Sequence, residues 1–121
     1  MKDVITPVHV ERRLRELGAE LDHATTRCEE AEFTYVKAKT DYDLSSAKER
    51  MAMRDRALER GSKVTVQEIE DHALLRCANQ YTDLNIAEAT VKAARANVSR
   101  IRVQIDIARS VGTSVRASLE V

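Results

Sequence analysis

The sequence predicts an all-α fold: a long antiparallel two-helix coiled-coil hairpin with a short C-terminal helical arm, which oligomerises into a helical bundle or ring. Its composition is the first reason, because 3% aromatic residues, 33% charged residues and only 3 glycines in 121 residues are typical of long helices. The second reason is that apolar residues recur at spacings of three and four along two long spans. The third is a single strong turn signal between the two spans.

The first helix is expected over about residues 7–60. Thr6 is a suitable N-cap, and Pro7 follows at the first helical position, where a missing N–H costs nothing. The expected seam of this helix alternates steps of four and three and reads Val10, Leu14, Leu17, Leu21, Ala24, Cys28, Ala31, Tyr35, Ala38 and Tyr42.

The turn between the spans carries the best local signal in the chain. Gly61 can adopt the positive φ that ends a helix, and Thr65 can cap the next one. Glu68 stands three residues after Thr65, which makes a capping box, while Val64 and Ile69 supply a hydrophobic staple. We therefore expect a sharp reversal of the chain here.

The turn is expected at residues 61–65 and the second helix over about residues 66–111. Its seam reads Leu74, Cys77, Tyr81, Leu84, Ala87, Val91, Ala94, Val98, Ile101, Ile105 and Ala108. Folding at the turn sets Tyr42 near Leu84 and Ala38 near Ala87. Small residues then oppose one another, which allows the helices to approach closely.

The second helix carries another apolar stripe, roughly 160 to 200° around the helix from its seam. One hairpin partner can cover only one face, so the stripe predicts a homo-oligomer interface built on this helix. The alternative is that alanines are exposed here for helix propensity alone. The predicted interface residues are Ile86, Ala89, Ala93, Ala96, Val103 and Ile107.

Residues 112–121 are expected to form a separate C-terminal arm, because Gly112 suggests a break in the helix. Small polar residues together with Arg109 and Arg116 suit an arm that swaps onto a neighbouring subunit or contacts phosphates. A frayed terminus is the alternative.

Charge is balanced overall, with 20 basic and 20 acidic residues, but it is arranged in blocks. Residues 16–43 hold eight acidic and three basic side chains, and residues 92–118 hold six basic and one acidic. Antiparallel pairing lays these blocks side by side, so much of this charge is expected to complement itself and steer register.

The basic residues near the turn have no such partner block, although Glu68, Glu70 and Asp71 neutralise part of them. Spacings of four place Arg50 with Arg54 and Arg56 with Arg60, and such guanidinium pairs suit phosphate oxygens. A solvated polar face is the alternative. The predicted nucleic-acid-binding residues are Lys48, Arg50, Arg54, Arg56, Arg60, Lys63, Arg109 and Arg116.

No catalytic, metal-binding or cofactor motif is found. His23 and Cys28, like His72 and Cys77, are five residues apart, whereas zinc ligands on a helix are spaced by three or four. We expect no enzyme activity, cofactor, small-molecule substrate or membrane association. A cytoplasmic location, a single domain over residues 1–121 and no intrachain disulfide are the remaining expectations.

The order of elements resembles bacteriophage recombination mediators of the UvsY type. The resemblance is carried by residues 47–60 ahead of Gly61, by residues 96–101 and by residues 110–112, and the end of the chain also looks like small actinobacteriophage proteins. It implies a ring-forming, phage-encoded protein that binds single-stranded DNA and helps load a recombinase in place of single-strand-binding protein. The DNA-contacting basic residues of the family would correspond to Arg54 and Arg56. No aromatic residue follows Tyr81, so contacts should be mainly electrostatic.

Two hypotheses result. The first is a non-enzymatic, oligomeric accessory of recombination that binds single-stranded DNA. The second is a structural or adapter coiled-coil protein that binds a protein partner through exposed apolar helix faces, with no nucleic-acid role.

Overall fold

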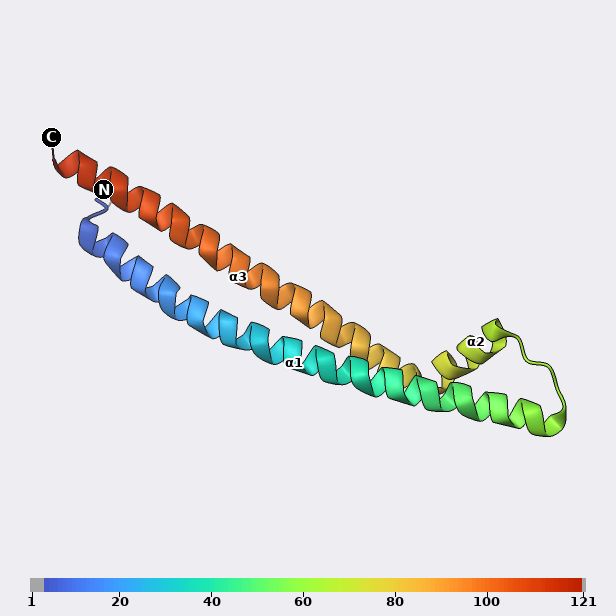
Figure 1. Cartoon of the computed structure of the whole chain (residues 1–121). Helices are drawn as coiled ribbons and strands as arrows, with labels where there is room; N and C mark the ends of the chain where they lie inside the picture. The colour runs from blue at the N-terminus through green and yellow to red at the C-terminus, as the bar shows by residue number, and fades with distance from the viewer. Residues whose placement is uncertain (1–3, 121) are drawn as a thin grey trace. The chain divides into compact units, whose positions relative to one another are not determined.

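The computed structural model describes residues 4–120, which form three α-helices and no strand. The prediction of an all-α fold is confirmed. In chain order the helices are α1 (Pro7–Arg60), α2 (Val66–Arg76) and α3 (Ala78–Leu119) (Figure 1).

The chain divides into two compact units. Unit 1 comprises Met1–Glu30 with Lys92–Val121, and unit 2 comprises Ala31–Val91. The first turns of α1 therefore pack with most of α3 in unit 1, and the rest of α1 packs with α2 and the start of α3 in unit 2. A single domain over the whole chain stays a prediction.

Unit 1 has a small apolar core between α1 and α3. Leu17 and Ile101 are its most buried side chains, at 1% and 2% exposure, and Ala24 and Val98 complete the buried cluster. Leu21, Cys28, Ile105 and Ala108 pack around it, half-buried. Val10 at the start of α1 meets Gly112 near the end of α3, so the two segments run antiparallel.

Unit 2 holds α2 and the start of α3 against α1. The rings of Tyr42 and Tyr81 contact each other in a tilted arrangement, with centroids 5.5 Å apart. Tyr81 lies about one turn before Leu84, the residue that was expected to meet Tyr42. Ile69 and Ala73 of α2 are buried, whereas Leu74, a predicted seam residue, is 39% exposed. All ten seam positions predicted on α1 are buried or half-buried.

The start of α1 forms as the sequence predicts. The backbone N–H of His9 donates to Thr6 Oγ1 at 3.4 Å, and the N–H of Thr6 donates back to His9 Nδ1 at 3.3 Å. His9 thus takes the place of the Glu in a capping box, and the backbone N–H groups of Thr6 and His9 both gain an acceptor.

The turn also has the expected chemistry. Gly61 has a φ of 65°, and Ser62 N–H donates to Ala57 O at 2.9 Å, which is a Schellman ending of α1. Thr65 caps α2, because its hydroxyl accepts from the Glu68 N–H at 3.1 Å. Within the described residues the Glu68 carboxylate makes no return bond to Thr65, so only half of the capping box is present.

The second predicted helix is interrupted at Cys77, a feature that the sequence analysis missed. Cys77 has φ −106° and ψ 25°, yet its N–H still donates to Ala73 O at 3.0 Å and its carbonyl accepts from Tyr81 N–H at 2.9 Å. Ile69, Ala73 and Cys77 are buried at steps of four, and each such step turns about 40° beyond a full helical turn. The interruption at Cys77 thus divides the predicted second helix into α2 and α3 while Ile69, Ala73 and Cys77 stay buried.

The predicted break at Gly112 and the separate arm over residues 112–121 are wrong for the described residues. Helix α3 runs without interruption to Leu119. Gly112 is buried, and a Cβ built on it would lie 2.9 Å from Val10 Cγ1. Glycine is therefore needed here because Val10 packs against the helix backbone, and this close packing holds the end of α3 on α1.

Candidate nucleic-acid interface

A basic pocket lies at the turn between α1 and α2. It has a volume of about 290 Å³. Apolar side chains from both sides of the turn line it, and its polar lining groups are two guanidiniums, a hydroxyl and an imidazole. The lining residues are Met53, Arg56, Ala57, Arg60, Ser62, Val64 and His72. We call it the turn pocket.

Arg56 is held in place by α2. Its Nη2 lies 3.3 Å from His72 Nε2, and since arginine can only donate, the imidazole nitrogen accepts. Glu49 Oε2 lies 3.5 Å from the same nitrogen and 3.8 Å from Arg76 Nε. The two sides of the turn are thus linked through His72.

Arg50 does not belong to the turn pocket. Its Nη1 lies 3.7 Å from Glu70 Oε2 and donates to the Ser46 hydroxyl at 3.1 Å. The Arg50–Glu70 contact agrees with the expectation that acidic residues after the turn neutralise part of the basic charge, whereas the partner of Arg56 is His72, which was not expected. Glu70 and His72, the partners of Arg50 and Arg56, both belong to α2, which lies on α1.

Four further predicted residues near the turn are also exposed: Lys48, Arg54, Arg60 and Lys63. Within residues 4–120 none of their side chains forms an ion pair or hydrogen bond. Arg60 lines the turn pocket, but Arg54 does not. Of the two expected guanidinium pairs, Arg56 and Arg60 line the turn pocket together, whereas Arg50 and Arg54 do not line it.

Arg109 and Arg116 belong to unit 1, so the structure does not join them to the turn pocket. Arg109 is exposed, and Arg116 Nε donates to the Gly112 carbonyl at 3.3 Å. This bond turns Arg116 back along α3, next to Val10 and Pro7.

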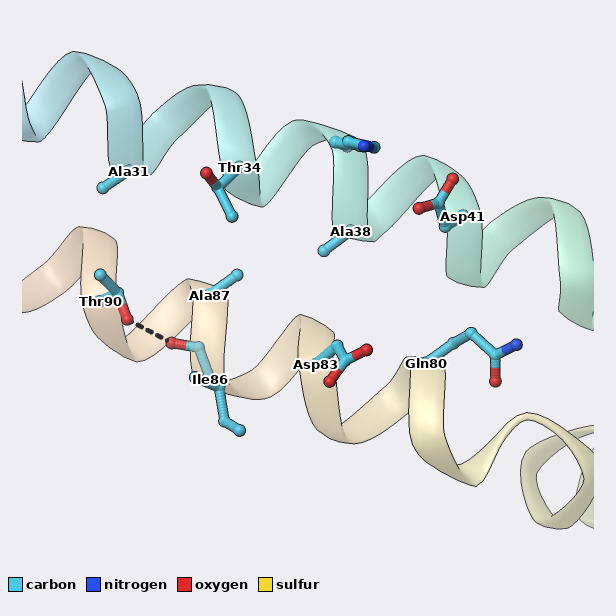
Figure 2. A pocket seen from close by; sticks show the side chains of 10 residues that line it. Ala31, Thr34, Ala38, Asp41, Gln80, Asp83, Ile86, Ala87 and Thr90 are labelled. Carbon is cyan, nitrogen blue, oxygen red and sulfur yellow. Dashed lines mark hydrogen bonds between the residues drawn. The ribbon is translucent and has the colours of Figure 1, made fainter.

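A second hollow in unit 2 lies between α1 and α3, with a volume of about 410 Å³. Figure 2 shows Ala31 and Ala38 of α1 pointing toward Ala87 of α3. The small residues do face one another, as expected, and they leave an apolar groove. The hydroxyl of Thr90 donates to the Ile86 carbonyl at 2.8 Å, so this polar group is already satisfied.

The predicted oligomer interface on α3 is exposed in the single chain. Ile86, Val103 and Ile107 are 56–60% exposed, and the three alanines of the stripe are exposed as well. Near Ile107 a hollow of about 320 Å³ is lined by Gln104, whose Oε1 is buried without a hydrogen-bond partner. An exposed apolar stripe of this kind suits a covering partner.

Sequence reasoning missed Ser62 and His72 as pocket residues. His72 was considered only as a metal ligand, and the described residues contain no cluster of three or more side chains suited to a metal ion. The signal that points to His72 is its place one and a half turns into α2, on the same side as buried Ile69 and Ala73.

Comparison with protein-family models, curated proteins and solved structures gives no match. In the described part of the chain, no helix is long and apolar enough to cross a membrane.

Proposed function

We propose that this chain is a non-enzymatic, oligomeric protein that binds single-stranded DNA and assists recombination. The turn pocket is the observation that carries the proposal. Arg56 and Arg60 line one hollow together with the hydroxyl of Ser62, and guanidinium and hydroxyl donors are the groups that bind phosphate oxygens.

The surroundings of the turn pocket support the same proposal. Arg54, Lys48 and Lys63 are exposed and make no ion pair among residues 4–120, so their charges remain available to a nucleic-acid backbone. The described aromatic rings do not line the pocket, which suits contacts to phosphates more than base stacking. The role in recombinase loading, in place of single-strand-binding protein, rests on the resemblance to the UvsY-type mediators.

Fluorescence anisotropy with a labelled single-stranded oligothymidylate tests the proposal. We expect binding at low salt and an affinity that falls steeply as salt rises, because phosphate contacts release counterions. Arg56→Glu with Arg60→Glu should weaken binding by about tenfold or more, since both charges in the pocket are reversed.

The matched control is Arg12→Glu with Arg15→Glu, which makes the same charge change at two exposed positions of α1 in unit 1. The control should change affinity by at most about twofold. Equal losses in both double variants would show that the turn pocket has no special role, and no binding at low salt would refute the proposal.

A protein adapter is the second candidate function. It is favoured by the exposed apolar side chains Ile86, Val103 and Ile107 on α3. Ile107→Glu or Ala93→Glu should then abolish binding to a protein partner, while Arg56→Glu with Arg60→Glu should leave it unchanged. Copurification of a tagged chain with and without these substitutions distinguishes the two functions.

A further inference from the structure

Helix α1 carries a second apolar stripe within unit 2, and all of its side chains except that of Ala47 are exposed. Its large members are more than half exposed: Phe33 75%, Val36 60%, Leu44 58%, Met51 61% and Leu58 79%. Thr40 and Ala47 lie at the positions between them. We call these seven residues the α1 stripe.

The α1 stripe is a continuous seam. Its members, with Arg54, follow one another at steps of three or four residues from Phe33 to Leu58, which keeps them on one side of a helix at about 100° per residue. The buried seam residues Ala31, Ala38 and Tyr42 lie on the opposite side. Helix α1 in unit 2 therefore has two apolar faces, of which α2 and α3 cover one.

Charged residues flank the α1 stripe on both sides, and their order is self-complementary. In a parallel, in-register pair of helices, a residue on one flank meets the residue five positions later on the opposite flank of the partner. Three charged pairs have this spacing and placement, and all three have opposite signs: Glu32 with Lys37, Asp43 with Lys48, and Arg50 with Asp55.

We propose that a second copy of this chain docks on the α1 stripe, with the two α1 helices parallel and in register. The same sequence supplies both members of each charged pair, so each pair forms twice in the dimer. These three pairs are the observation that supports the parallel arrangement.

The intrachain contacts of the flanking residues leave room for these pairs. Within residues 4–120, Lys37, Lys48 and Asp55 form no ion pair. Asp43 contacts Lys39 at 3.3 Å and Arg50 contacts Glu70 at 3.7 Å, but these are surface pairs that can exchange partners at little cost.

The parallel arrangement has a consequence for binding. It brings the turn pockets of the two copies to the same end of the pair, so one polyanion strand can engage both pockets and gain avidity. The dimer itself does not depend on the proposed DNA binding, and its test uses the chain without nucleic acid.

Sedimentation equilibrium of the full chain tests the interface. We expect self-association that Met51→Glu weakens by at least tenfold, because a charge enters the centre of the seam. Leu75→Glu is the matched control, since Leu75 is 77% exposed on α2 and lies outside the α1 stripe. A monomeric chain at micromolar concentration, or equal weakening by both substitutions, would overturn the proposal.

A charge exchange tests the orientation. Lys48→Glu alone should weaken the dimer, because Lys48 faces Asp43 of the other copy, and adding Asp43→Lys should restore it. Oxidation of Leu44→Cys, in a chain with Cys28 and Cys77 replaced by serine and alanine, should link two copies through the same position. Failure of the second substitution to restore association, or linkage of Leu44→Cys only to Leu58→Cys of another copy, would exclude the parallel dimer.

Discussion

Gly112→Ala tests the packing of the end of α3 against the start of α1. Alanine is favoured over glycine inside a helix by about 1 kcal/mol, so the substitution alone would be stabilising. Here the added Cβ would meet Val10 Cγ1 at 2.9 Å, well inside the usual carbon contact. Crowding of this kind costs about 1–3 kcal/mol in a packed site, so the net effect should be neutral to destabilising by about 2 kcal/mol.

Urea unfolding followed by circular dichroism at one protein concentration provides the measurement. Gly18→Ala is the matched control, because Gly18 is also helical but has no atom within 4 Å of an added Cβ. It should stabilise the chain by about 1 kcal/mol. In a Val10→Ala background the obstructing methyl group is gone, and Gly112→Ala should become stabilising by about the same amount.

If Gly112→Ala stabilises the unsubstituted chain as much as Gly18→Ala does, the close packing of Val10 on Gly112 is refuted. The separate C-terminal arm would then regain support. If Val10→Ala leaves the effect of Gly112→Ala unchanged, the two residues are not coupled, and the account of the glycine fails in the same way.

Three further predictions concern stability. Thr65→Ala should destabilise the chain by about 1 kcal/mol in the same urea assay, because the Glu68 N–H loses its acceptor; no change would mean that the cap is dispensable. Leu17→Ala should cost about 2–5 kcal/mol, since Leu17 is 1% exposed, and a loss below about 1 kcal/mol would contradict a packed core in unit 1. Alanine at Tyr42 and Tyr81, singly and together, should give a coupling of about 0.5–1.5 kcal/mol by double-mutant cycle, and strict additivity would contradict the ring contact.

Local signals in the sequence were sufficient for the ends of α1 and the turn. Thr6 with Pro7, Gly61 and Thr65 act through their own backbone conformation and nearby N–H groups, so their effects do not depend on distant packing. The α1 seam was equally accessible, because a repeat of three and four residues fixes which side is buried.

The features that the sequence analysis missed depend on tertiary contacts. Gly112 has the local signature of a helix end, but its role is set by Val10, which is distant in the sequence. Cys77 has no helix-breaking side chain, so no local signal marks the interruption there. The turn pocket needs His72 beside Arg56, a contact that appears only once α2 lies on α1.

The salt dependence of binding to single-stranded DNA tests the central proposal most directly. The slope of log affinity against log salt concentration counts the phosphates that the protein neutralises. We predict a clear negative slope for the unsubstituted chain, and a slope smaller by about two for each binding site when Arg56 and Arg60 are both replaced by alanine. An unchanged slope, or no measurable binding at low salt, would contradict the assignment of the turn pocket as the nucleic-acid interface.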